Sequence, residues 1–207
     1  MIERSGLVRR GVRLNLLTIG YNIVEALVSL AAGLMAGSVA LVGFGIDSGI
    51  EVTAGAAALW RLRSDHSPPQ RERAERTTLR LVSVLFLLLA TYVTTDSVLA
   101  LVARDAPGRS PLGVAILILS VVVMPVLARA KRRVADAMGS GALAAEATQT
   151  SLCAYLSAIA LAGVGLNALL GWWWADPVAA LAMVPIIGKE GLAGIRGRSN
   201  CTDDCCR

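Results

Sequence analysis

The chain contains six apolar stretches, each long enough to cross the hydrocarbon core of a lipid bilayer as an α-helix. These stretches cover approximately residues 14–34, 38–60, 80–103, 111–130, 141–168 and 174–195. A bilayer core about 30 Å thick needs about 20 apolar residues in a helix, whereas a membrane β-strand needs only about ten residues of alternating polarity. Segments such as LVSVLFLLLA show no such alternation. The sequence therefore predicts an all-α integral membrane protein with six transmembrane helices.

The composition also favours a membrane protein. Hydrophobic residues make up 55% of the chain and charged residues 17%, whereas about a quarter of the residues in a soluble domain are charged. The first stretch carries Glu25 and is followed by no convincing cleavage site, so we expect a membrane helix there and not a signal peptide. We expect one six-helix transmembrane domain over residues 1–198 and a short tail rich in Cys and Asp over residues 199–207.

The basic residues predict the orientation of the chain in the membrane. All but two of the 20 Lys and Arg residues lie in four segments: Arg4 to Arg13, Arg61 to Arg80, Arg129 to Arg133, and the end of the chain from Lys189. The connections between these segments carry only Arg104 and Arg109. By the positive-inside rule, both termini are cytoplasmic and Trp172 to Trp174 belong to an outer aromatic belt. The net charge of +5 then reflects topology, so we expect a multi-pass protein of the cell membrane with no nucleic-acid partner.

Two pairs of polar residues interrupt the apolar stretches. Asp47 and Glu51 lie in the second stretch and Gln149 and Cys153 in the fifth, and the spacing of four places each pair on one helix face. The motif Gly-Ser-x-Ala-Leu precedes both pairs, with an offset of 102 positions that also relates the pairs themselves. Each pair begins roughly 14 Å into its helix, near the bilayer midplane. We therefore expect two antiparallel helices to bring four metal-type ligands together.

The chemistry of the four side chains points to a transition-metal ion. A charged residue inside a bilayer costs on the order of 3 kcal/mol, and two acids one turn apart repel each other unless a cation or protons intervene. Two carboxylates, a thiolate and an amide oxygen suit Zn²⁺ or a similar ion, whereas Mg²⁺ and Ca²⁺ prefer oxygen ligands alone. Three alternatives remain open: a neutral, hydrogen-bonded pair of acids, a Cys153 that only packs between helices, and a Gln149 that orients a ligand or bonds between helices.

These residues resemble the membrane domain of the cation diffusion facilitator (cation efflux) family. In that family six membrane helices have both ends inside, and the metal site uses two side chains four positions apart on helix two and a matching pair on helix five. SVALVGFGIDSGIE looks like the helix-two segment, and GSGALAAEATQTSLCAYLS looks like the helix-five segment. The resemblance extends over about residues 13–195, with Asn22 and Asp176-Pro177 as further matches, and it implies metal ligation by Asp47, Glu51, Gln149 and Cys153.

The chain also departs from the pattern of this family. Typical members have His and Asp where this chain has Gln149 and Cys153, and Asp where it has Glu51. Many members carry a cytoplasmic metal-binding domain after helix six that supports dimerisation. This chain is instead similar to a branch that consists of the membrane domain alone, and the resemblance leaves a homodimer open.

Other polar residues in the apolar stretches have two interpretations each. Asn22 and Glu25 share a face of the first helix, where they flank the entry path and ligate the ion directly or, in the other interpretation, orient a ligand or serve a structural role. Glu146 lies one turn closer to the cytoplasm than the fifth-helix pair and is a first stop for the ion or an acid at a helix start. Asp96 assists release or accepts a hydrogen bond from a hydroxyl group. Asp176, followed by proline, is typical of a structural N-cap.

The C-terminal tail contains a second group of metal-type ligands. Cys201, Cys205 and Cys206 flank two aspartates, and cytosolic thiols remain reduced, so metal capture is expected here unless the tail is simply disordered. The single histidine, His66, lies in the segment SDHSPP and is expected to be solvated.

The sequence predicts a secondary transporter that exports a divalent transition-metal cation, with Zn²⁺ as the leading candidate, by alternating access around the midplane site. Metal ligands must be deprotonated, so exchange of the metal for protons is expected. The alternative is a membrane protein that binds metal as a sensor, or scaffolds a partner, without transport. We expect no enzyme, because no nucleophile and base occur at a recognisable spacing, and we expect no cofactor.

Overall fold

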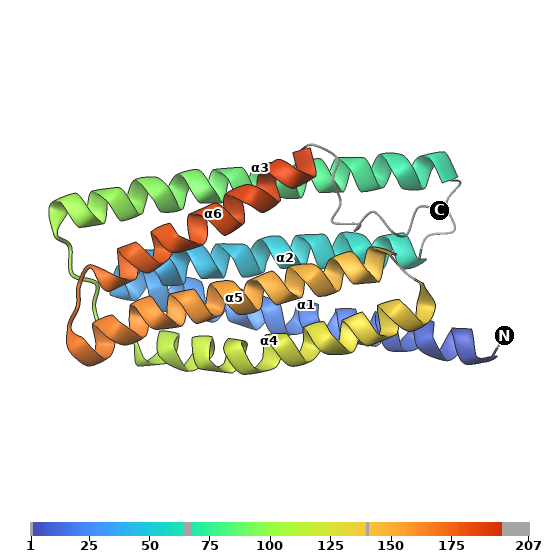
Figure 1. The fold of residues 1–207 in the computed structure, drawn as a ribbon, viewed down its shortest axis with the longest axis horizontal. Helices are drawn as coiled ribbons and strands as arrows, with labels where there is room; N and C mark the ends of the chain where they lie inside the picture. The colour runs from blue at the N-terminus through green and yellow to red at the C-terminus, as the bar shows by residue number, and fades with distance from the viewer. Residues whose placement is uncertain (1, 64–67, 140, 196–207) are drawn as a thin grey trace.

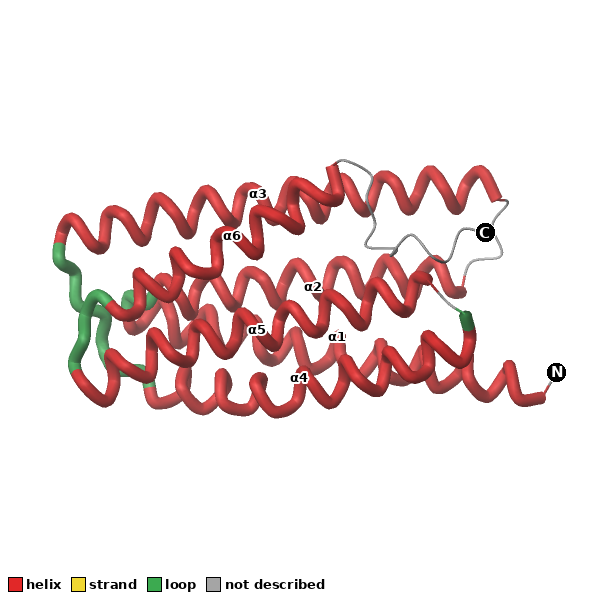
Figure 2. Tube along the Cα trace, in the orientation of Figure 1, coloured by secondary structure: helices red, strands yellow, loops and turns green. Residues whose placement is uncertain are grey.

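The computed structural model describes residues 2–63, 68–139 and 141–195. Within these ranges the chain forms six α-helices and no strand, as Figures 1 and 2 show. The helices are α1 (Ile2–Ala36), α2 (Val39–Arg63), α3 (Pro68–Ala103), α4 (Pro111–Met138), α5 (Gly141–Leu170) and α6 (Ala175–Ile195). Each helix contains a segment long and apolar enough to cross a membrane. The predicted all-α, six-span fold of a multi-pass integral membrane protein is therefore confirmed.

Consecutive helices run in opposite directions, so the bundle has two distinct ends (Figure 1). One end, which we call the basic end, is where α1, α3 and α5 begin, and it carries the exposed side chains of Arg9, Arg10, Arg13, Arg129, Arg132 and Arg133. The other end, which we call the tryptophan end, contains Trp172 and Trp174, whose stacked rings have centroids 5.2 Å apart. The assignment of the basic end to the cytoplasm stays a prediction from the positive-inside rule.

Several helices extend further toward the basic end than the apolar stretches predicted. α3 begins at Pro68, twelve residues before the predicted third apolar stretch, so the charged residues that precede this stretch are helical. Proline is favourable in the first turn of a helix, and the following QRERAER segment consists of strong helix formers. α4 continues through the basic segment after residue 130 and ends at Met138. Gly139, with a left-handed φ of 60°, forms its C-cap. This extension places Lys131 within a helix. His66 lies outside the described residues.

α2 forms the centre of the bundle. It packs against α1, α3, α5 and α6, while α4 pairs with α5 and with α1, and α3 pairs with α6. In its most apolar window, 67% of the residues of α2 are buried inside the protein, compared with 22% to 39% for the other five spans. Side chains on α2 therefore face protein on several sides, whereas the outer helices direct most of their apolar surface outward.

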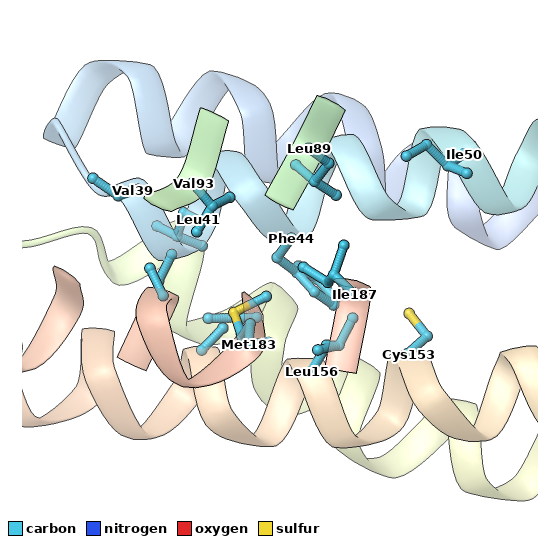
Figure 3. Packing of buried hydrophobic residues seen from close by; sticks show 14 of the residues in the cluster. Val39, Leu41, Phe44, Ile50, Leu89, Val93, Cys153, Leu156, Met183 and Ile187 are labelled. Atoms are coloured by element: carbon cyan, nitrogen blue, oxygen red, sulfur yellow. The ribbon is translucent and has the colours of Figure 1, made fainter. Parts of the chain in front are cut away.

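The apolar core fills the bundle toward the tryptophan end. Phe44 of α2, Leu156 of α5 and Met183 of α6 converge there with Ile187, and all of them are almost completely buried (Figure 3). Because α2 begins at the tryptophan end, Phe44 lies closer to that end than Asp47 does, and Met183 lies beside Phe44 on the side of Val39 (Figure 3). The packed core thus separates the middle of the bundle from the tryptophan end.

Asp176 fixes the start of α6 to the start of α2. Its carboxylate accepts a hydrogen bond from the Ser38 hydroxyl at 2.6 Å and another from the Val39 backbone amide at 2.9 Å. The prediction of a structural cap is correct in kind but wrong in its target, because Asp176 caps α2 and not its own helix. The N–H groups in the first turn of α2 have no partner within the helix, which explains the demand for this acceptor.

A glycine contact brings α1 and α2 close together. A Cβ atom at Gly45 would lie 2.9 Å from the backbone nitrogen of Leu30, which cannot move without shifting α1. Small residues at such contacts allow membrane helices to approach closely. One turn further along α2, a Cβ atom at Gly49 would meet no atom within 4 Å.

We predict that Gly45→Ala destabilises the bundle by about 1–3 kcal/mol, because the added methyl group overpacks the contact between α1 and α2. Thermal unfolding of the purified protein in detergent measures the change. Gly49→Ala is the matched control and should leave the melting temperature unchanged or raise it. Equal melting temperatures for both variants would show that α1 and α2 do not approach each other as described.

Candidate metal-binding site

The four side chains of the two predicted pairs line one cavity. Asp47 and Glu51 reach it from α2, and Gln149 and Cys153 reach it from α5, which runs antiparallel to α2 and packs against it. The cavity has a volume of about 110 Å³. The i, i+4 spacing explains the arrangement, because it turns both members of each pair toward the same side of their helix. Their role as metal ligands stays a prediction.

The four side chains do not already form a compact metal cluster. Among the described residues, no three His, Cys, Asp or Glu side chains lie close enough together to hold one ion. A cavity of about 110 Å³ has room for several water molecules. A four-coordinate Zn²⁺ ion requires ligand atoms at about 2.0–2.3 Å. Ligation by both pairs would therefore require α2 and α5 to close around the ion.

Asn22 of α1 orients one of the predicted ligands. Its side-chain amide donates a hydrogen bond of 2.7 Å to a carboxylate oxygen of Glu51. Both side chains are buried, with exposed fractions of 1% for Asn22 and 6% for Glu51. A buried charge-assisted hydrogen bond of this length holds the carboxylate in a defined position. This geometry fits the interpretation of Asn22 as a residue that orients a ligand, whereas direct ligation of the ion by Asn22 stays a prediction.

Glu25 of α1 connects the two ligand-bearing helices. Its Oε2 atom accepts a hydrogen bond from the Ser48 hydroxyl of α2 at 2.8 Å and lies 3.8 Å from the sulfur of Cys153 in α5. Its other oxygen has no hydrogen-bond partner among the described residues, although the side chain is fully buried. Together with Asp47 and Glu51, Glu25 makes the middle of the bundle rich in buried carboxylates. Such groups require a cation or protons nearby.

Glu146 forms an ion pair with Lys131, a residue that the sequence analysis did not place near the site. The Lys131 ammonium of α4 lies 3.3 Å from a carboxylate oxygen of Glu146 and donates to the Thr150 hydroxyl at 3.1 Å. The apolar stretch predicts that α4 ends near residue 130, which places Lys131 among the basic residues at the membrane surface. The stripe of buried residues on α4 includes Met124, Ala128 and Lys131, so a longer helix would have indicated the inward position.

Glu190 of α6 is a second residue that the sequence reasoning missed. It lines the same cavity as Asp47 and Glu51 but lies closer to the basic end. It follows Lys189 directly, where the topology argument begins to count cytoplasmic charge, although it also lies within the sixth apolar stretch. The helical period of that stretch, followed from the buried Met183 and Ile187 to Glu190, indicates that Glu190 faces the bundle.

Two other predicted groups lie away from the cavity or cannot be placed. Asp96 accepts a hydrogen bond of 3.2 Å from the Tyr92 hydroxyl on its own helix. This agrees with the interpretation in which Asp96 accepts a hydrogen bond from a hydroxyl group. Cys201, Cys205 and Cys206 lie outside the described residues, so metal capture by the tail stays a prediction.

Residues 16–196, which include nearly all of the six-helix bundle, match the cation efflux transmembrane domain. The chain belongs to the cation efflux family. The resemblance inferred from the segments around the two pairs is therefore confirmed. The chain is also 26% identical over 166 residues to the magnetosome protein MamB of Paramagnetospirillum magneticum, which corresponds to 77% of this chain and 56% of that protein. The chain thus matches little more than half the length of this relative.

For this cation efflux protein, we predict that Asn22→Ala weakens Zn²⁺ binding by about 10–100-fold, because Glu51 loses the group that orients it. Isothermal titration calorimetry of the purified protein measures the affinity. Asn167→Ala is the matched control, since Asn167 is also a buried asparagine but donates to the Pro107 backbone carbonyl at 2.9 Å, away from both cavities. An equal loss in both variants would indicate a general packing defect and contradict the orienting role of Asn22.

Proposed function

We propose that this cation efflux protein moves a divalent transition-metal ion, Zn²⁺ in the first place, through a site formed by Asp47, Glu51, Gln149 and Cys153. The observation that supports the proposal is their convergence on one cavity from two antiparallel helices. Secondary transporters often bind their substrates near the membrane midplane between such elements.

The shape of the cavity supports transport that starts at the basic end. The residues that line it extend from Asp47 toward Ala145 at the start of α5 and Gly194 at the end of α6, and both of these lie at the basic end. On the other side, the packed core around Phe44 and Met183 blocks the way to the tryptophan end. If the basic end is cytoplasmic, as the positive-inside rule predicts, this arrangement is the form that loads an ion for export.

Binding of the metal ion by all four side chains favours a change in conformation. Metal ligation by both pairs brings the four side chains closer together, because Asp47, Glu51 and Cys153 do not form a compact ligand group in the described structure. A ligand shifts a conformational equilibrium only through a difference in its affinity for the two forms. The form in which all four side chains contact the ion binds it more tightly than the open form, and this provides the difference in affinity. The packed core at the tryptophan end must then open for the ion to leave.

The chemistry of the site favours Zn²⁺ and proton exchange. Cys153 offers a soft thiolate beside two carboxylates, a ligand set that Mg²⁺ and Ca²⁺ do not prefer. The ligands must lose their protons to bind metal, and the empty carboxylates are stabilised by protons when no cation is present. Protons therefore replace the metal on Asp47 and Glu51 after release, and a proton gradient drives the cycle.

We predict that Asp47→Asn reduces metal uptake into proteoliposomes by more than about tenfold, because the central anionic ligand is lost. Uptake is measured across Zn²⁺, Cd²⁺, Mn²⁺, Co²⁺ and Fe²⁺, with and without an imposed pH gradient. The expected order places Zn²⁺ and Cd²⁺ first, and the gradient stimulates uptake.

Asp96→Asn is the matched control, since Asp96 is a membrane aspartate that bonds to Tyr92 on its own helix. It should transport at the rate of the unmodified protein. Unchanged uptake by the Asp47 variant would contradict the proposed site. Zn²⁺ binding without any uptake by the unmodified protein would favour the alternative function, a metal sensor or scaffold.

A further inference from the structure

A lysine is completely buried between α4 and α5. Lys131 has an exposed fraction of 0%, and its ammonium contacts Glu146 at 3.3 Å and Thr150 at 3.1 Å. A buried ion pair is a poor source of stability, because the loss of hydration offsets the attraction between the charges. In a membrane bundle, ionisable residues at such positions usually belong to an ion pathway. The position of Lys131 therefore calls for a functional explanation.

The Lys131 ammonium lies next to the proposed metal site. A small cavity of about 10 Å³, with room for about one water molecule, lies between Lys131, Glu51 and Gln149. The lining is rich in oxygen and amide groups, which come from Asn15, Thr18, Asn22, Glu51, Glu146, Gln149 and Thr150. This is the type of surrounding that a cation prefers, and the ammonium of Lys131 is the cation that the chain itself supplies.

One hydrogen-bond donor of the Lys131 ammonium remains available for a contact in the direction of Glu51. An ammonium group has three donors, and Glu146 and Thr150 engage two of them. The side-chain oxygens of Asn15 and Asn22 are buried, and neither accepts a hydrogen bond from any residue in the described part of the chain. Asn22 itself holds Glu51. A continuous polar path thus leads from the ion pair of Lys131 and Glu146 to a predicted metal ligand.

We propose that Lys131 is a tethered cation that competes with the metal ion for Glu51, with Glu146 as its partner while metal is bound. This inference rests on the proposed function, because it assumes that Glu51 is a metal ligand. When the ammonium stays with Glu146, Glu51 is available to the metal. When it shifts toward Glu51, it weakens metal binding and promotes release. Lys131 is then a residue that sets the affinity of the transporter and not a ligand of the ion.

This role predicts opposite effects for the two members of the ion pair. Lys131→Met removes the competing cation, so Zn²⁺ should bind about tenfold more tightly, with a lower KM and a lower kcat for transport. Glu146→Gln releases Lys131 toward Glu51, so Zn²⁺ should bind about tenfold more weakly. A pair that only supports the fold would shift the affinity in the same direction in both variants.

The test is Zn²⁺ titration calorimetry on the full chain in nanodiscs, combined with transport kinetics in proteoliposomes. Lys131→Arg and Glu146→Asp keep the charges and should bind Zn²⁺ almost as the unmodified protein does. Arg133→Met is the matched control, because it removes one positive charge from an exposed position of the same helix. It should not change the affinity.

Opposite shifts in the Lys131→Met and Glu146→Gln variants support the proposal, and shifts in one direction or no shifts overturn it. If Lys131→Met does not fold, weaker binding in Glu146→Gln than in Glu146→Asp supports the proposal, and equal binding overturns it. Failure of the proposed function is distinguishable, because then the unmodified protein binds no Zn²⁺ or the Asp47→Asn variant binds it equally well.

Discussion

The arrangement of this bundle depends on the cost of placing carboxylates where water is excluded. Glu25, Asp47 and Glu51 are all buried in the middle of helices that cross the membrane. Each requires a hydrogen-bond donor, a proton or a cation. Asn22 and Ser48 supply donors to Glu51 and Glu25. Protons, or an ion in the cavity between α2 and α5 as we propose, meet the remaining demand. The electrostatic requirement and the proposed transport function therefore concern the same site.

The same requirement explains how polar contacts organise the helices. At the tryptophan end, Asp176 fixes α6 to the first turn of α2, and the packed core around Phe44 lies next to it. At the basic end, Lys131 links α4 to α5 through Glu146. The cavity lies between a tightly packed end and an end held by an ion pair. A conformational change that exposes the cavity to the tryptophan end must loosen the packed core there and tighten the contact between helices at the basic end.

The fold and the main pairs could be predicted from sequence because both depend on local periodicity. Apolar stretches of about 20 residues define membrane helices, and a spacing of four places Asp47 with Glu51 and Gln149 with Cys153. Lys131 and Glu190 could not be placed in the same way. Lys131 follows the predicted apolar part of α4, where the hydropathy signal ends before the helix does. Glu190 lies inside the sixth stretch but beside Lys189, so it reads as part of the charge at the membrane surface. The inward position of both residues depends on the register of their helix and on the neighbouring helix, and neither is visible in composition alone.

The central claim, that one ion binds between α2 and α5 with Cys153 among its ligands, can be measured directly by zinc X-ray absorption spectroscopy. The full chain is loaded with one equivalent of Zn²⁺. The expected spectrum contains one sulfur atom at about 2.3 Å, with oxygen ligands at about 2.0 Å, and the sulfur is lost in Cys153→Ser. A spectrum without sulfur would contradict the role of Cys153. Two or more sulfur atoms would place the ion at Cys201, Cys205 and Cys206 and contradict the central claim.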